Sequence, residues 1–177
     1  TYAKLGWMTD DYAMAKTMDV VSQHGGMVCV HAETGLAIDY IMDRMLAEKA
    51  NFAERFLETS PDIAEAEGIF RAVYIGRLMN CPVYIPHISS AEGLQVIRFL
   101  KQMGYAVIAE TCPQYLGLTW DGLKSRGPLG KVGPSIKTED DRMALWAAMQ
   151  EGIFDSIGSD HAPKDKKVED DFFDAAY

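Results

Sequence analysis

Short apolar runs alternate with longer segments of helical periodicity along this 177-residue chain. The runs at residues 26–33 and 81–90 each lead into a histidine, and the run at 153–163 leads into an aspartate. A fourth run, at 105–110, ends in Glu110. Runs this short, with helices between them, are typical of buried parallel strands in an α/β protein. Such proteins bind ligands at the carboxyl ends of their strands, so these polar positions form the candidate site.

Helices are predicted for the segments between the runs. Residues 10–22 have apolar side chains at helical spacing and are followed by two glycines, and residues 36–56 predict one longer helical region. Ser60 is expected to be the N-cap of another helix, with Pro61 as its first residue. One side of that helix would present Ile63, Ala66, Phe70 and Val73.

Two capping signals mark the later helices. Residues 89–92 have the form of a capping box and predict a helix that ends at Gly104. Residues 138–141 predict the cap of a final helix that ends at Gly152. The glycine- and proline-rich residues 124–137 between these helices are expected to form a loop.

Four strands with helical crossovers fit two architectures, an open doubly wound sheet or part of a (β/α)8 barrel. No glycine-rich nucleotide fingerprint follows any of the strands, and polar residues recur at the strand ends, so the barrel is favoured. Residues 1–177 are expected to form one incomplete domain, because no internal repeat divides them. The chain starts at Thr1 without an initiator methionine, so we expect an internal piece of a longer polypeptide.

Composition and charge narrow the function classes. The chain is 48% hydrophobic and 24% charged, which is typical of a globular protein with a sizeable core. Its net charge of −9 opposes binding to nucleic acid or to anionic membranes, and no apolar stretch approaches the roughly 20 residues of a membrane span. The three cysteines lie in or beside apolar runs, which predicts buried thiols in a reducing compartment, the cytoplasm.

The strand-end residues have the chemistry of a metal site. His31, His87 and Asp160 would project into one pocket if the strands are parallel neighbours. Neutral imidazole and carboxylate are zinc ligands in hydrolytic sites, where an open position lets the metal activate water. Each residue also has a simpler interpretation, because a strand-end histidine can be a hydrogen-bonded core residue and Asp160 can cap a turn. His161 can likewise serve only to orient Asp160.

Four motifs, in order along the chain, favour the metal site. They are His-Ala-Glu-Thr-Gly at 31–35, Pro-His-Ile-Ser-Ser-Ala-Glu at 86–92, Glu-Thr-Cys-Pro-Gln-Tyr-Leu at 110–116 and Ser-Asp-His-Ala-Pro at 159–163. Together they resemble successive motifs of the cyclic amidohydrolases, the group that includes hydantoinase, dihydropyrimidinase, dihydroorotase and allantoinase. The resemblance implies the C-terminal half of a (β/α)8 barrel, about strands 5 to 8.

The resemblance also implies roles for individual residues. His31 and His87 would bind one of two zinc ions, and Asp160 would bind the other and move a proton. Tyr2 occupies the place of a tyrosine that hydrogen-bonds the developing oxyanion in the hydantoinase branch, which would make it catalytic and substrate-binding. Gly133 stands where that branch has a serine that binds the ring through its backbone, so it is a second candidate substrate contact.

Two elements of the family's site have no match in the chain. A His-x-His motif is absent, and the lysine that is carboxylated to bridge the two metals is expected a few residues before Thr1. Lys4 is the nearest candidate for that lysine, but it follows Tyr2 rather than preceding it. The chain alone is therefore expected to be inactive.

The motifs disagree on the ring that is opened. Residues 112–116 and Tyr2 resemble the hydantoinase and dihydropyrimidinase branch, which we favour, whereas residues 160–163 are similar to dihydroorotase and allantoinase. No cationic cluster for a substrate carboxylate is evident. The resemblance also implies a homo-oligomer, a tetramer or a dimer. A non-catalytic, metal-free relative of dihydropyrimidinase that acts as a protein-binding scaffold is the alternative from another class.

Overall fold

The computed structural model describes residue 6 and residues 8–174. One sheet contains four strands, β1 (Val28–Cys29), β2 (Val83–Ile85), β3 (Val107–Thr111) and β4 (Ser156–Ile157). The strands lie in sequence order, and each pairs in parallel with the next. The predicted α/β class and the parallel arrangement of neighbouring strands are therefore confirmed.

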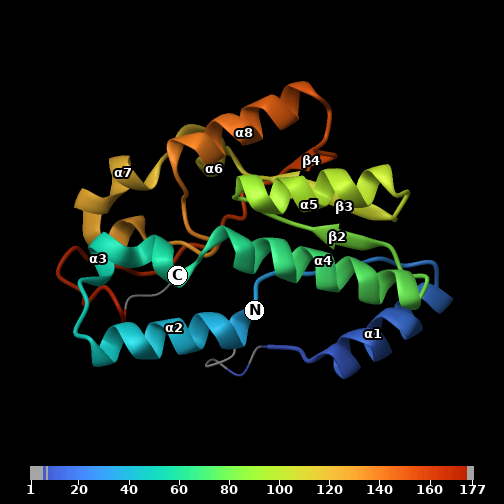
Figure 1. Cartoon of the computed structure of the whole chain (residues 1–177), viewed down its shortest axis with the longest axis horizontal. Helices are drawn as coiled ribbons and strands as arrows, with labels where there is room; N and C mark the ends of the chain where they lie inside the picture. The colour runs from blue at the N-terminus through green and yellow to red at the C-terminus, as the bar shows by residue number, and fades with distance from the viewer. Residues whose placement is uncertain (1–5, 7, 175–177) are drawn as a thin grey trace.

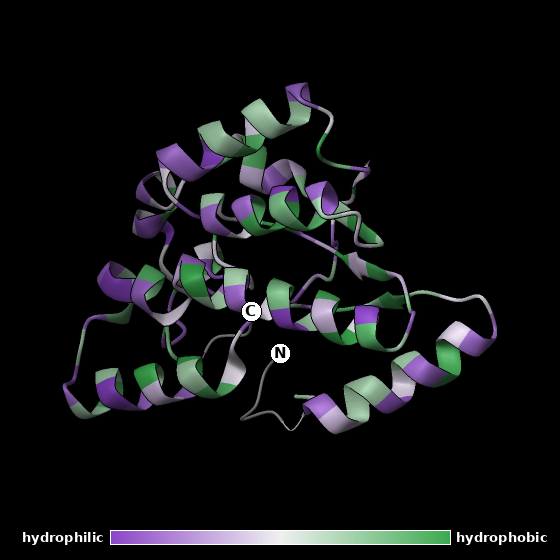
Figure 2. Ribbon diagram, turned by 45° about the vertical axis from the view of Figure 1, so that its right-hand side comes forward, coloured by the Kyte–Doolittle hydropathy of each residue, from purple (hydrophilic) through white to green (hydrophobic). Residues whose placement is uncertain are grey.

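Helices precede, connect and flank these strands (Figure 1). The α-helices are α1 (Asp11–Gln23), α2 (Gly35–Ala47), α3 (Phe52–Arg55), α4 (Asp62–Leu78), α5 (Ala91–Gln102), α6 (Pro113–Gly117), α7 (Trp120–Leu123) and α8 (Glu139–Gln150). Two 3-10 helices, η1 (Phe56–Thr59) and η2 (Lys124–Gly130), complete the chain. Figure 1 shows α4 and α5 in front of β2 and β3, with α1 and α8 on either side. Purple and green alternate along the helices in Figure 2, as expected when one side faces the sheet.

The two faces of the sheet differ in burial. Val83 and Ile85 of β2, and Val107 and Ala109 of β3, are buried, whereas Tyr84 between them in β2 is only partly buried. Successive strand residues point to opposite faces, so the helices cover one face of the sheet. This is the arrangement of an arc of a barrel, in which helices form the outer layer and the other face of the sheet lines the interior.

The long helical region predicted for residues 36–56 is interrupted. Helix α2 ends at Ala47, and Lys49 has a φ of +52°, which does not continue a right-handed helix. Asn51 then begins α3, because its side chain accepts a hydrogen bond from the backbone N–H of Glu54. The expectation of one continuous helix was wrong because a local left-handed residue and a new cap separate two helices.

Helix α4 buries only part of the predicted face, since Ala66 and Val73 are buried as predicted but Ile63 and Phe70 are not. Ile63 is 64% exposed and Phe70 is 38% exposed, whereas Ile69 is fully buried. The reason is close packing at glycines: a Cβ at Gly76 would lie 2.4 Å from a methyl group of Val83. Glycine at this position allows the helix to approach the sheet closely.

The caps agree in part with the predictions. Thr138 and Asp141 form the predicted capping box of α8. The N-cap of α5 is Ser90, whose side chain accepts a hydrogen bond from the Gly93 N–H, so Glu92 does not complete a capping box there. The N-cap of α4 is Pro61 rather than Ser60, and the Ser60 hydroxyl bonds elsewhere. Residues 124–130 of the predicted loop form η2.

The cysteines are free thiols, as predicted, but not all of them are buried. Cys81 and Cys112 are buried, whereas Cys29 is exposed on the sheet face opposite the helices. Burial raises the pKa of Cys112 to about 12, with the nearby Glu110 and Asp160 carboxylates adding to the effect, so this thiol is unreactive at neutral pH.

Across the described residues, no helix combines the length and hydrophobicity needed to span a membrane.

Candidate metal centre

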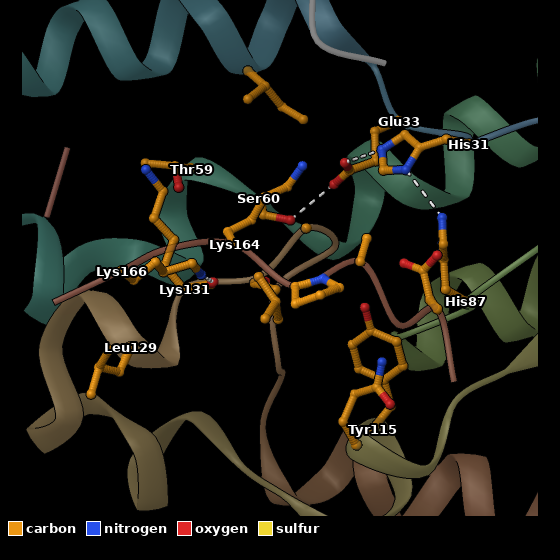
Figure 3. A pocket seen from close by; sticks show the side chains of 18 of the residues that line it. His31, Glu33, Thr59, Ser60, His87, Tyr115, Leu129, Lys131, Lys164 and Lys166 are labelled. Atoms are coloured by element: carbon orange, nitrogen blue, oxygen red, sulfur yellow. Dashed lines mark hydrogen bonds and ion pairs between the residues drawn. The ribbon is translucent and has the colours of Figure 1, made fainter. Parts of the chain in front are cut away.

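The two candidate histidine ligands occupy equivalent places on neighbouring strands. His31 lies two residues beyond the end of β1, and His87 lies two residues beyond the end of β2. Because β1 and β2 are parallel and paired, both side chains emerge at the same end of the sheet. His31 Nδ1 lies 3.2 Å from His87 Nε2, and the two rings meet edge to face (Figure 3).

The pair of nitrogens fits the chemistry of a divalent metal. Zinc–nitrogen bonds of 2.0–2.1 Å with tetrahedral angles place two ligand nitrogens about 3.3 Å apart, close to the spacing between these rings. His87 is buried, and this burial, together with the charge of His31, lowers the pKa of His87 to about 4. The ring is therefore neutral at neutral pH, which is the form that binds a metal.

Glu33 holds the other nitrogen of His31. Its Oε2 lies 2.8 Å from His31 Nε2, and its Oε1 accepts a hydrogen bond from Ser60 at 2.9 Å (Figure 3). Burial would raise the pKa of Glu33, but the hydrogen bond and charge of His31 and the charge of Lys137 outweigh it and lower the pKa to about 2. A carboxylate on the far nitrogen fixes the orientation of a metal-binding histidine.

Lys137 is a buried cation behind this pair. Its ammonium group donates to the backbone oxygen of Ser60 and forms an ion pair with Asp62 at 3.1 Å. Its side chain is only 3% exposed, so the charge lies within the protein and is compensated by these neighbours. Neither Glu33 nor Lys137 was predicted from the sequence, although Glu33 lies within the same motif as His31.

Asp160 and Gly133 line the same cleft as the two histidines. Asp160 is exposed and has a φ of +48°. Within residue 6 and residues 8–174, no three His, Cys, Asp or Glu side chains lie close enough together to hold a metal ion. The structure therefore brings His31 and His87 together and places Asp160 in the lining of the same cleft, while Tyr2 lies outside the described residues.

Three lysines line the cleft away from the histidines, namely Lys131, Lys164 and Lys166 (Figure 3). Lys131 donates to the backbone oxygens of Phe172 and Phe173. Burial, with the charge of Lys166, lowers the pKa of Lys131 to about 8. No cationic cluster was predicted from the sequence, because Lys131 lies more than 30 positions before Lys164 and Lys166 and all three lie outside the four motifs.

Ser135 adds a polar group to the cleft wall. The residue is fully buried, and its hydroxyl has no hydrogen-bond partner in the described part of the chain.

Glu110, at the end of a third predicted strand, is not among the cleft residues. It accepts a hydrogen bond from Tyr84 at 2.5 Å on the inner face of the sheet and also contacts Ser156.

Comparison with known proteins places this arrangement in a family. No family model matches the chain. The D-hydantoinase of Ralstonia pickettii is 34% identical over 157 residues, which are 87% of this chain and 34% of that protein. The solved D-hydantoinase of Bacillus sp. AR9 superposes with a TM-score of 0.86 at 30% identity, over 95% of this chain and 38% of that one. The chain belongs to the cyclic amidohydrolases.

Other members of the cyclic amidohydrolases match over a similar span. The allantoinase of Solibacter usitatus (strain Ellin6076) is 34% identical over 93% of this chain and 36% of its own length. The solved dihydropyrimidinase of Brevibacillus agri NCHU1002 has a TM-score of 0.83 at 32% identity. The chain spans about a third of the length of these relatives. Its four strands are an arc of a (β/α)8 barrel, and relatives in the hydantoinase group are generally metal-dependent.

Proposed function

We propose that the protein containing this chain is a metal-dependent hydrolase that opens the cyclic amide bond of a hydantoin or dihydropyrimidine ring. The observation that carries the proposal is the His31–His87 pair, with two ring nitrogens facing each other at 3.2 Å inside a cleft. Two ring nitrogens this close to each other gain little unless a cation or a proton lies between them.

The residues of the chain would supply one part of a zinc centre. His31 through Nδ1 and His87 through Nε2 would hold one ion, and Asp160 would contribute to a second. The bridging carboxylated lysine and the remaining ligands would come from outside this chain. When bound, such metals lower the pKa of a water molecule and polarise the ring carbonyl.

The other residues would place and move charge around the ring. Glu33 keeps the His31 ring oriented so that Nδ1 faces the cleft. Asp160 would accept a proton from the attacking water and later deliver it to the leaving ring nitrogen. The backbone of Gly133 would contact the ring, and Tyr2 would donate a hydrogen bond to the oxyanion as charge develops there.

The substrate is a small cyclic amide. The cleft has a volume of about 1140 Å3, which accommodates a five- or six-membered ring with substituents. Allantoin is a second candidate ring, because the match to an allantoinase extends over 93% of the chain. Dihydroorotate remains a further candidate, since Lys131, Lys164 and Lys166 could face a carboxylate.

The test uses the purified full-length protein loaded with zinc. Hydantoin, dihydrouracil, allantoin and dihydroorotate would be offered separately, and ring opening followed by loss of the cyclic substrate. We expect one of the first two rings to open fastest and about two metal ions to be bound per subunit. A protein that binds no divalent metal and opens none of the rings would instead support the scaffold alternative.

Assembly into a tetramer or dimer is part of the same proposal. Sedimentation of the full-length protein would show one species at a small multiple of the subunit mass. A monomer at micromolar concentration would contradict that part and leave the chemistry unaffected.

A further inference from the structure

A buried glutamate on α4 holds the backbone that follows His87. Glu65 is 3% exposed, and each of its carboxylate oxygens accepts hydrogen bonds from one serine. Oε1 accepts from the backbone N–H and the hydroxyl of Ser89, both at 2.9 Å. Oε2 accepts from the backbone N–H of Ser90 at 2.9 Å and from the Ser90 hydroxyl. Four donors therefore converge on this one carboxylate.

These serines lie at the end of a turn that begins at His87. His87 has a φ of +45°, in the left-handed region that non-glycine residues seldom adopt. Such a conformation persists only where neighbouring contacts impose it. From the sheet side, Ile88 donates its N–H to the Glu110 carbonyl at 2.8 Å and accepts from Thr111 at 2.8 Å. From the helix side, Glu65 accepts hydrogen bonds from the backbone N–H groups of Ser89 and Ser90.

The same part of α4 also contacts the segment that follows His31. The carbonyl of Ala64 accepts a hydrogen bond from the Thr34 N–H at 3.1 Å. A Cβ at Gly68 would lie 2.6 Å from the backbone of Ala32 and Glu33, so glycine allows this close approach. One stretch of α4 therefore lies against both histidine-bearing segments.

The space around Glu65 is matched to its carboxylate. A Cβ at Gly93 would lie 2.5 Å from Glu65 Oε2, so a larger residue there would displace the carboxylate. A buried carboxylate is costly unless its oxygens are hydrogen-bonded, and here both are. Burial raises the pKa of Glu65, while the charge of Lys137 and the serine hydrogen bonds oppose that rise.

We propose that Glu65 is a positioning residue for His87: by binding Ser89 and Ser90 from α4, it fixes the turn that presents His87 Nε2 to His31 Nδ1. Ser90 also caps α5 through the Gly93 N–H, so an outright loss of Glu65 would disturb a helix end as well. The inference rests on the proposed function only in taking His87 as a metal ligand.

The test compares two isosteric substitutions in the full-length protein, Glu65→Gln and Glu92→Gln. Glutamine at 65 keeps one acceptor oxygen but turns an amide donor toward the donors of one serine, so about half of the contacts are lost. Glu92 is exposed in the first turn of α5, so its substitution makes the same charge change beside the same turn. Co2+ is the probe, because its visible absorption reports both its affinity and its ligand geometry.

We expect Glu65→Gln to weaken Co2+ binding about 10- to 100-fold and to change the absorption bands, with Glu92→Gln equal to wild type. In the metal-free protein, amide hydrogen exchange at residues 88–91 should accelerate in Glu65→Gln alone. A Glu65→Gln protein that is less stable but retains wild-type Co2+ affinity and exchange at this turn would overturn the proposal, because Glu65 would then serve only the fold.

A milder variant covers the case in which Glu65→Gln does not fold. Ser89→Ala removes one hydroxyl donor and leaves the backbone bond, so a smaller loss of Co2+ affinity is expected, and an unchanged affinity would count against the proposal. Ring opening is measured separately. If the wild-type protein opens no ring or binds no Co2+, the proposed function fails, while the exchange rates at residues 88–91 still decide whether Glu65 positions the turn.

Discussion

The two histidines and Asp160 are held in the cleft in different ways. His31 and His87 are surrounded by buried polar groups, with Glu33 on one ring and the Glu65-bound turn behind the other. Asp160 lies on an exposed segment after β4, and the residues from 159 to 165 are exposed as well. The histidines are fixed by contacts within the chain, whereas the described residues make few contacts with the Asp160 segment.

The difference separates two kinds of contribution. Groups that hold a metal need fixed geometry, and the buried partners of the histidines provide it. A group that moves a proton needs reach and access to water, which an exposed aspartate has. Substitutions of the buried partners of the histidines should therefore change metal affinity and stability, and substitution of Asp160 should change the rate of the reaction.

The largest effect is expected at Asp160. Asp160→Asn in the full-length protein keeps the size of the side chain and removes the base, so kcat should fall about a hundredfold to ten-thousandfold with little change in Tm. Steady-state kinetics with hydantoin or dihydrouracil would measure the loss. Metal content must be determined in the same sample, because a fully metallated variant with near wild-type kcat would show that Asp160 moves no proton.

Lys137 should have the largest effect on stability. Lys137→Met removes a buried cation that pairs with Asp62 and donates to Ser60. We expect a loss of about 3 kcal/mol in the free energy of unfolding, the lower end for a broken buried pair, because Asp62 is partly exposed and can be hydrated. Denaturant unfolding would measure it.

The matched control for that change is Lys124→Met. Lys124 pairs with Asp121 at 2.8 Å on the surface, where ion pairs contribute about 0–1 kcal/mol. Equal losses in the two variants would mean that Lys137 is no more important to the fold than a surface lysine.

A smaller effect is expected at Glu33. Glu33→Gln retains a hydrogen bond to His31 but removes the charge that holds this ring, so metal affinity should fall about 10- to 100-fold. Competition with a coloured chelator would measure the affinity. Glu67→Gln on the exposed side of α4 is the control. An equal metal affinity in the two variants would show that Glu33 does not support metal binding.

The smallest effect is expected at Ser135. Its buried hydroxyl has no partner in the described part of the chain, so Ser135→Ala should leave the free energy of unfolding within about 0.5 kcal/mol of wild type. If the hydroxyl contacts the ring, KM rises and kcat does not. A large loss of stability would reveal a protein partner for this hydroxyl instead.

Local patterns in the sequence predicted the sheet and the two histidines well. Period and run length are properties of neighbouring residues, so the parallel strands, the placement of His31 and His87 after β1 and β2, and the Thr138 cap could all be predicted. The same reasoning predicted the buried face of α4 only in part, because periodicity does not show where Gly68 and Gly76 let the helix approach its neighbours closely.

The contacts that support the histidines could not be predicted in this way. Glu65 meets Ser89 across 24 positions, and Lys137 meets Ser60 across 77. No periodicity or spacing links residues so far apart, and only the folded chain brings them together. Glu92 is the glutamate of the motif at 86–92, but the carboxylate that binds Ser89 and Ser90 belongs to Glu65 on α4.

A crystal structure of the full-length protein grown with zinc would test most directly whether His31 and His87 bind the same metal ion. Anomalous diffraction would be collected at the zinc edge. We predict an anomalous peak between His31 and His87, with Nδ1 of the first and Nε2 of the second at about 2.0–2.1 Å from the same ion. Zinc bound elsewhere, with the two nitrogens still facing each other at 3.2 Å, would contradict the central claim.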